Sequence, residues 1–380
     1  MTGAALVVAG GTPSGVAVVG GRIAEPGAAP AGALTLDAAG CVVVPGFIDL
    51  QCNGASGIDL TAEPERLWEV AAVLPRWGVT AWLPTIVTAP AGARRRALEA
   101  WRAGPPPSVG GGGPLATPLG LHFEGPFLAP ERRGAHPLKY VAAPDPGLVE
   151  SEGWAGAVAL VTLAPELPGA VDLIRALVAQ GIVVSAGHSS ATAAEARAAV
   201  DAGVSYVTHL FNAMAPLHHR EPGLAGVALS DDRLRAGLIA DGLHVDPAVV
   251  AVAARALGDR LSLVTDAVAA LGAPPGPVPL GTLTAEVSAE DGGVRLPDGT
   301  LAGSTLALDQ AVRNLVAFAG VPLADAAGAV TTVPARVLGL ADRGTLDLGA
   351  AGDLVLLDDD GTLVATVIGG RVAYDRRDGD

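Results

Sequence analysis

Residues 182–212 read IVVSAGHSSATAAEARAAVDAGVSYVTHLFN. Two apolar, strand-like runs, 182–190 and 204–212, flank an Ala-rich stretch of helical period at 191–203, and each run carries a histidine. Nearly continuous apolar strands joined by a helical crossover are typical of a parallel sheet that is buried on both faces. The segment therefore predicts one strand–helix–strand unit of an α/β protein.

The same alternation extends through the middle of the chain. Helical period recurs at 172–180 and 248–258, between apolar runs, and the sequence becomes irregular from the Pro-rich stretch 274–281 onward. The apolar runs predict eight strands, at 42–51, 78–87, 116–125, 157–166, 182–190, 204–212, 235–244 and 260–268. Eight such units predict a (β/α)8 TIM-type barrel, whose active site lies at the carboxyl ends of its strands.

The two ends of the chain have a different pattern. Residues 4–45 and 351–376 read as short strands that are interrupted by glycine and proline. We expect the ends to pair into one small β domain, made of residues 1–45 and 335–380. The barrel would then occupy residues 46–334.

Composition and charge exclude several classes of protein. The net charge of −15 argues against nucleic acid or an anionic membrane surface as a partner. Every long apolar stretch is interrupted by proline, glycine or charge, and no basic region precedes the apolar N-terminus, which argues against a membrane span and a secretory signal. Cys41 and Cys52 are too few for a disulfide framework, so we expect a cytoplasmic protein.

All seven histidines lie between His122 and His244. A carboxylate or histidine stands at or just past the end of five predicted strands, and a barrel would bring these five to one mouth: Glu124, His188, His209, His244 and Asp266. Glu124 with two histidines would bind Zn²⁺ or a similar ion and leave a position open for water, while Asp266 could transfer protons. Taken singly, each histidine could instead be an ordinary hydrogen-bonded residue, and each buried carboxylate the partner of an arginine.

The motifs that contain these residues resemble those of a known family. In order along the chain, from about residue 40 to residue 340, the sequence resembles N-acetylglucosamine-6-phosphate deacetylases of the amidohydrolase superfamily. The resemblance is carried by PGFIDLQCNG (45–54), LHFEGPFL (121–128), RRGAH (132–136), VTLAPE (161–166), SAGHSSAT (185–192), THLFNAM (208–214), REPGLAG (220–226), IADGLHVDP (239–247), LVTDAV (263–268) and LAGSTLALDQAVRNLV (301–316). The ends also resemble the split β-sandwich of that superfamily, which makes a small β-sandwich the expected terminal domain.

The resemblance implies a role for individual residues. Glu124, His188 and His209 match the metal ligands, and Asp266 matches the catalytic acid and base. The residues that match the substrate site are Ala135, His136, Asn212, Ala213, Arg220, His244, Leu301, Ala302 and Gly303. Arg220 matches a phosphate ligand, a task that suits the bidentate and permanently charged guanidinium. A surface position for Arg220, and a capping or core position for His244, are the alternatives.

Two positions depart from the wider superfamily. Many amidohydrolases carry His-x-His after the first strand and bind a second metal there, but this chain has Gln51 and Asn53. Neutral amides are poor ligands for a transition metal. We therefore expect one divalent metal per subunit, with Zn²⁺ the best fit and Fe²⁺, Co²⁺ and Mn²⁺ as alternatives. Gln51 would bond to the reactive water or a loop, or have a purely structural place.

The implied reaction is metal-dependent hydrolysis of N-acetylglucosamine 6-phosphate to glucosamine 6-phosphate and acetate, with a homodimer in which Arg220 or His244 could reach a neighbouring subunit's site. The nearest alternative is a deacetylase of another amino sugar, such as N-acetylgalactosamine 6-phosphate. A non-catalytic sugar-phosphate sensor, or a barrel with buried histidines and no metal, are the remaining alternatives.

Overall fold

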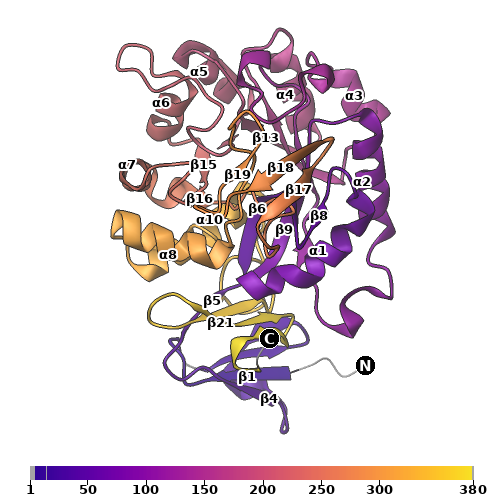
Figure 1. Cartoon of the computed structure of the whole chain (residues 1–380). Coiled ribbons are helices and arrows are strands. Elements are labelled where there is room, and N and C mark those ends of the chain that lie inside the picture. Colours follow the sequence, from indigo (N-terminus) through magenta and orange to yellow (C-terminus); the bar gives the residue numbers. More distant parts are fainter. Residues whose placement is uncertain (1–4, 14, 379–380) are drawn as a thin grey trace.

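The computed structural model describes residues 5–13 and 15–378, so residues 1–4, 14 and 379–380 of the predicted terminal domain lie outside the described residues. Figure 1 shows two parts, a large body of helices around strands and a smaller group of strands below it, which contains β1 and β21 from the two ends of the described chain.

The large part contains a sheet of nine parallel strands. One of them, β10 (Thr117–Pro118), pairs with β9 just before β11 does. The other eight follow sequence order around the predicted barrel, which is confirmed. The strands do not pair as a continuous ladder between the last and the first, where the amide of Asp266 bonds to the carbonyl of Gln51 (2.9 Å) and the amide of Asn53 to that of Ala267 (2.7 Å). The strands are β6 (Phe47–Cys52), β9 (Val79–Val87), β11 (Leu121–Glu124), β12 (Val158–Leu163), β13 (Val183–Ala186), β14 (Tyr206–Val207), β15 (Arg235–Leu238) and β16 (Leu261–Leu263).

Helices cover the outside of the strands (Figure 1). They are α1 (Leu67–Val73), α2 (Ala91–Ala103), α3 (Pro146–Ser151), α4 (Ala170–Ala179), α5 (Ala193–Ala202), α6 (Gly223–Ser230), α7 (Pro247–Leu257), α8 (Leu308–Ala319), α9 (Leu323–Gly328) and α10 (Thr332–Val337). The predicted helical stretches correspond to α4, α5 and α7. A capping box, in which Thr192 and Glu195 satisfy each other's backbone amides, fixes the start of α5. Among the described residues, no helix is both long and apolar enough to cross a membrane.

The ends of the chain form two four-stranded sheets. One contains β1 (Ala5–Ala9), β2 (Val16–Val19), β3 (Arg22–Ala24) and β4 (Leu34–Asp37), and the other contains β5 (Val42–Pro45), β20 (Leu354–Leu357), β21 (Leu363–Ile368) and β22 (Arg371–Asp375). Apolar side chains of both sheets form one buried cluster, to which Leu6, Val18 and Leu354 belong. The division of the chain at residues 45 and 335 stays a prediction.

The stretch predicted to be irregular from residue 274 is instead a β-hairpin, so that prediction is wrong. Strands β17 (Gly276–Leu280) and β18 (Leu283–Val287) pair antiparallel, and β19 (Val294–Arg295) pairs with β18. β17 is an edge strand of this sheet, so its outer edge has no ladder bonds that the missing N–H groups of Pro277 and Pro279 could remove. The hairpin crosses in front of the barrel in Figure 1. Two further short strands, β7 (Gly54–Ala55) and β8 (Ile58–Asp59), pair after β6.

Candidate active site

Alternation along β11 points the first candidate ligand into the barrel. Successive side chains of a strand face opposite sides. Phe123 packs edge-on against Trp154, with ring centroids 4.9 Å apart, on the helix side of the strand. His122 and Glu124 therefore face the interior, and Glu124 occupies the last position of the strand.

The other candidate residues lie just beyond the strands that precede them. His188 follows β13 by two residues, His209 follows β14 by two, and Asp266 follows β16 by three. All three have left-handed backbones, with φ of 50°, 30° and 47°. This conformation is costly for residues other than glycine and gathers at functional sites. The backbone thus turns these three side chains toward one point above the barrel axis.

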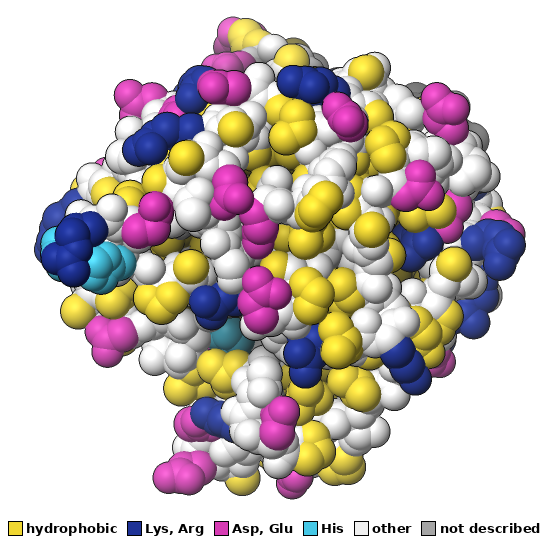
Figure 2. All heavy atoms as spheres, turned by 90° about the horizontal axis from the view of Figure 1, so that it is seen from above, with side chains coloured by type: hydrophobic (Ala, Val, Ile, Leu, Met, Phe, Trp, Pro, Cys, Tyr) yellow, Lys and Arg dark blue, Asp and Glu magenta, His cyan; other side chains and the backbone are white. Residues whose placement is uncertain are grey.

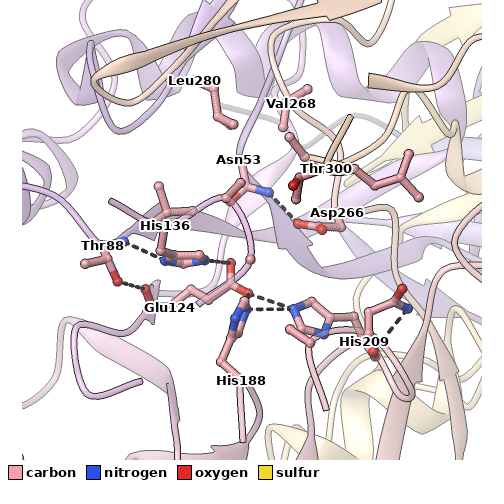
Figure 3. A pocket seen from close by; sticks show the side chains of 18 of the residues that line it. Asn53, Thr88, Glu124, His136, His188, His209, Asp266, Val268, Leu280 and Thr300 are labelled. Atoms are coloured by element: carbon pink, nitrogen blue, oxygen red, sulfur yellow. Dashed lines mark hydrogen bonds and ion pairs between the residues drawn. The ribbon is translucent and has the colours of Figure 1, made fainter. Parts of the chain in front are cut away.

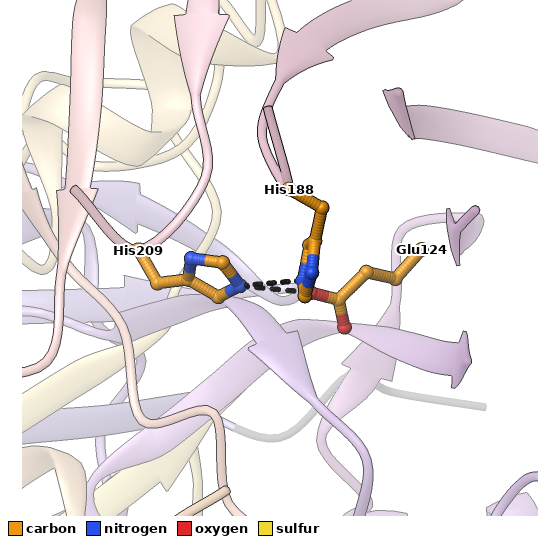
Figure 4. Close-up of side chains that lie close together, drawn as sticks. All are labelled: Glu124, His188 and His209. Carbon is orange, nitrogen blue, oxygen red and sulfur yellow. Dashed lines mark hydrogen bonds and ion pairs between the residues drawn. The ribbon is translucent and has the colours of Figure 1, made fainter. Parts of the chain in front are cut away.

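Glu124, His188 and His209 form a cluster that can hold a metal ion. Glu124 Oε1 lies 3.0 Å from the Nε2 atoms of both histidines, and the two Nε2 atoms lie 3.0 Å from each other. Figure 4 shows the three side chains converging from separate strands. Ligand atoms bound to tetrahedral Zn²⁺ at about 2.0–2.1 Å lie roughly 3.3 Å from each other, so only a small adjustment separates this arrangement from a zinc site.

Hydrogen bonding prepares His188 for such an ion. Its Nδ1 lies 2.9 Å from the backbone carbonyl of Arg132. Because a carbonyl only accepts, Nδ1 carries the ring proton, which leaves the lone pair of Nε2 free to bind a metal. The Nδ1 atom of His209 is buried and has no hydrogen-bond partner among the described residues. The chemistry and spacing of the three groups fit one divalent cation.

His136 lies beside this cluster. Its Nδ1 accepts a hydrogen bond from the amide of Thr88 (3.3 Å), so the proton of the neutral ring is on Nε2, 4.0 Å from Glu124 Oε2. Figure 3 shows the ring between Thr88 and Glu124. Burial, reinforced by His188, lowers the pKa of His136 to about 3. His136 is therefore a neutral donor that faces the cavity.

Asp266 is held by the two amides that replace the superfamily's His-x-His pair. Gln51 Nε2 donates to Asp266 Oδ1 (3.0 Å) and to Glu124 Oε1 (3.2 Å), and Asn53 Nδ2 donates to the same Asp266 oxygen (2.7 Å). Gln51 thus bridges two carboxylates within this structure; a bond to the reactive water, which was one of the three alternatives predicted, stays a prediction. Burial and the nearby Glu124 raise the pKa of Asp266 to about 7.

Most of the predicted residues line one cavity of about 330 Å³. The predicted residues in its wall are Asn53, Glu124, Ala135, His136, His188, His209, Asn212, Ala213, His244, Asp266, Leu301, Ala302 and Gly303. Gln51 lies behind the wall through its bonds to Glu124 and Asp266. The structure places these residues together, while their roles stay predictions.

Arg220 is the predicted substrate-binding residue that lies outside the cavity wall. It is exposed, and its guanidinium lies 2.9 Å from the Nε2 of His219. His218 and His219 are the exposed histidines of the chain, with ring centroids 4.3 Å apart. Histidine and basic side chains gather at the left edge of the view in Figure 2, away from its centre. Within one chain, Arg220 does not reach the pocket.

Sequence reasoning missed several parts of the wall. Arg132 lines the cavity and donates to the hydroxyl of Ser190 (3.0 Å). Thr88 enters from the connection after β9, and the turn between β17 and β18 adds the segment 280–282. Arg132 could have been predicted from the motif RRGAH at 132–136. It stands three residues before Ala135, and both Ala135 and His136 were already predicted to bind the substrate.

Comparisons with known proteins agree with this geometry. The profile described as "Amidohydrolase family" matches residues 42–373. The N-acetylglucosamine-6-phosphate deacetylase of Bos taurus is 42% identical over 356 residues, which cover 89% of this chain and 85% of that protein. The N-acetylgalactosamine-6-phosphate deacetylase of Escherichia coli O157:H7 is 40% identical over 329 residues, with 83% and 84% covered.

A solved structure extends the likeness to three dimensions. A mutant N-acetyl-D-glucosamine-6-phosphate deacetylase from Mycobacterium smegmatis, in complex with N-acetyl-D-glucosamine-6-phosphate, superimposes with a TM-score of 0.86. It is 35% identical in sequence, and the superposition covers 98% of this chain and 100% of the other.

Proposed function

The chain belongs to the amidohydrolase family, and we propose that it hydrolyses the N-acetyl group of N-acetylglucosamine 6-phosphate to give glucosamine 6-phosphate and acetate. One observation carries the proposal. The cluster of Glu124, His188 and His209, which can hold a metal ion, shares a single cavity with Asp266. A divalent cation, with Zn²⁺ the best match to the ligands, would lower the pKa of a water toward 7 and polarise the acetyl carbonyl.

Asp266 moves the proton in this proposal. The carboxylate takes a proton from the attacking water and delivers it to the amide nitrogen as the carbon–nitrogen bond breaks. Oδ1 accepts from both Gln51 and Asn53, whereas no described residue bonds to Oδ2. Oδ2 is therefore the oxygen that carries the proton. A pKa of about 7 suits a group that must both accept and return a proton near neutral pH.

Other wall residues bind and orient the substrate. His244 would stabilise the negative charge that develops on the acetyl oxygen, a large contribution when the donor is fixed in advance. The segment 301–303 would contact the acetyl group, and His136, Asn212 and Ala213 would contact the sugar or its phosphate. All of them lie in the cavity wall.

The phosphate needs positive charge in a protein of net charge −15. Arg132 supplies a guanidinium within the cavity wall. We assign a second to Arg220 of another copy, because Arg220 is exposed and outside its own cavity. The proposal therefore includes a homodimer in which the loop containing Arg220 reaches the neighbouring site.

The proposed location is the cytoplasm. Cys41 and Cys52 are both unpaired and buried, as suits a reducing compartment.

Acetate release tests the reaction. Purified protein would be assayed with N-acetylglucosamine 6-phosphate as isolated, after chelation, and after Zn²⁺ is restored. We expect release that disappears on chelation and returns with the metal. Binding of the sugar phosphate without acetate release would instead establish a sensor, and absence of stoichiometric metal would establish a barrel with only structural histidines.

The stereochemistry at C4 of the sugar separates the two activities named among the relatives. We expect a higher kcat/KM for N-acetylglucosamine 6-phosphate than for N-acetylgalactosamine 6-phosphate. The reverse order would assign the chain to the second activity while leaving the site chemistry unchanged.

A further inference from the structure

A second cavity of about 460 Å³ lies next to the substrate cavity. His244 and Gly303 line both cavities, whereas Asp241 lines only the second. The imidazole of His244 therefore stands in the wall between them. A residue of the second cavity that bonds to one ring nitrogen of His244 therefore leaves the other nitrogen to face the substrate.

Asp241 holds the ring. Its Oδ2 lies 2.6 Å from His244 Nδ1, and the exposed fractions of the two side chains are 11% and 6%. The other carboxylate oxygen, Oδ1, accepts hydrogen bonds from the backbone amides of Leu243 and His244, both at 2.8 Å. The carboxylate is thus fixed by the loop through one oxygen and bonded to the imidazole through the other.

The charge of Asp241 is compatible with this arrangement. Burial opposes ionisation, but the hydrogen bond and charge interaction with His244 outweigh it and hold the pKa of Asp241 below its usual value. An ionised carboxylate has no proton to donate. The shared hydrogen must therefore belong to His244 Nδ1.

We infer that Asp241 is a positioning residue, which keeps a proton on His244 Nδ1 and directs Nε2 into the substrate cavity. The inference rests on the proposed function, since it supplies the orientation that His244 needs to contact the substrate. Nδ1 is committed to Asp241, so Nε2 is the ring nitrogen available to the substrate. It donates to the acetyl oxygen when the ring carries protons on both nitrogens and the Asp241 carboxylate balances the charge. Asp241 itself does not touch the reacting atoms.

A purely structural role for Asp241 would use Oδ1 alone, as an acceptor for the loop amides. Asp241→Asn separates the two roles. The amide oxygen can still accept from Leu243 and His244, but the NH2 group that replaces Oδ2 can only donate. The variant keeps the loop and reverses the polarity of the bond to Nδ1, so Nδ1 loses its proton and the ring is left without the positive charge that would stabilise the acetyl oxygen.

The test reads the ring directly and then its effect on turnover. Zinc-loaded protein with ¹⁵N-labelled histidine would give the protonation of each ring nitrogen by NMR, and His244→Gln would identify the signals of His244. We expect a proton on Nδ1 in the wild type and its loss from Nδ1 in Asp241→Asn. The variant should lower kcat/KM by about 10- to 100-fold, as expected for a group that orients another.

A double variant shows whether Asp241 acts through His244. Adding Asp241→Asn to His244→Gln should cause no further loss of kcat/KM, because the partner is already gone. Asp246→Asn is the matched control. Asp246 is an exposed carboxylate two residues from His244 that caps α7 by accepting from the amide of Ala248 (2.8 Å). It should leave the His244 signals and kcat/KM unchanged.

Several outcomes would overturn the inference. These are a wild-type ring that lacks a proton on Nδ1, an Asp241→Asn ring that retains it, or additive losses in the double variant. The wild-type spectrum decides the matter even if Asp241→Asn does not fold. Failure of the proposed reaction would appear separately, as a wild type that releases no acetate while its spectrum still reports the Asp241–His244 bond.

Discussion

The mouth and the floor of the barrel hold the same kinds of buried side chains in opposite arrangements. At the mouth, the polar atoms of Glu124, His188 and His209 converge on one another at 3.0 Å. One layer below, on the floor, His122 Nδ1 bonds to the hydroxyl of Thr85 (3.2 Å) and Nε2 to that of Thr162 (2.8 Å).

Asp49, the buried carboxylate of the floor, is also hydrogen-bonded to uncharged neighbours, as His122 is. It accepts from the hydroxyl of Thr265 (2.6 Å) and from the backbone amides of Gln51 and Thr265. The polar side chains of the floor are thus hydrogen-bonded to hydroxyl and backbone amide groups. At the mouth, three side chains that can each offer a lone pair to a metal face one another. Burial alone therefore does not identify a functional residue; convergence of several potential ligand atoms does.

The largest difference is expected between two histidine variants, one at the mouth and one on the floor. His188→Ala should abolish both metal binding and turnover, because it removes one of three ligands. His122→Gln, from the floor, should retain one ion per chain and lose about 1–3 kcal/mol of unfolding free energy through its broken hydrogen bonds. Elemental analysis and urea unfolding measure the two quantities. If His122→Gln lost its metal, His122 would also be needed for metal binding, and the mouth and the floor would not differ in that function.

Asp266→Asn should reduce kcat by about 10²- to 10⁴-fold, since an amide cannot accept the proton of water. The metal content should stay at the wild-type level, because Asp266 is not one of the three clustered ligands. Parallel kcat and metal measurements check both statements. A kcat near that of the wild type would remove Asp266 from the proton transfer.

A smaller effect is expected from the support behind the mouth. Glu166 accepts from the hydroxyl of Ser189 (2.7 Å) and the amide of Ser190 (2.5 Å), and so holds the turn after His188. Glu166→Gln should weaken metal affinity by about tenfold, as loss of outer-shell partners commonly does. Competition with a chromophoric chelator measures the change.

Glu195→Gln is the control for this variant, because Glu195 bonds to Thr192 at the exposed start of α5 and does not contact His188. Equal metal affinities of the two variants would show that the turn after His188 needs no support from Glu166.

The sequence predicted the barrel because each strand is an apolar run that a helix separates from the next. It predicted 42–51 as a single strand, although the domain boundary predicted after residue 45 cuts that run, and the structure has two strands there, β5 and β6. The break lies at Gly46, where an added Cβ would sit 2.1 Å from the hydroxyl of Thr80. The break is placed by the close approach of Gly46 to Thr80, a contact between segments distant in sequence that no local sequence pattern indicates.

The candidate site was predictable where side chains follow strands and unpredictable where loops contribute. Glu124, His188 and His209 stand at strand ends, so the barrel itself implies that they meet. Thr88 and Arg132 come from connections with no periodicity, and they reach the cavity only through tertiary packing. The left-handed backbones of His188 and His209 were equally invisible, because such conformations are uncommon outside glycine.

The smallest effect, with no expected change in turnover, concerns the carboxylate of the floor. Burial raises the pKa of Asp49 to about 6, above its value in the unfolded chain. The folded state therefore binds the proton more tightly, and stability should fall by about 1 kcal/mol as the pH rises from about 5 to 7. Asp49→Asn, which has no proton to lose, should remove that part of the pH dependence. Urea unfolding of both proteins, with chelator present so that metal release does not contribute, measures the difference. Identical slopes would mean that the hydrogen bonds from Thr265 and Gln51 stabilise the ionised form as well as water does, and the floor would then be as tolerant of charge as the mouth.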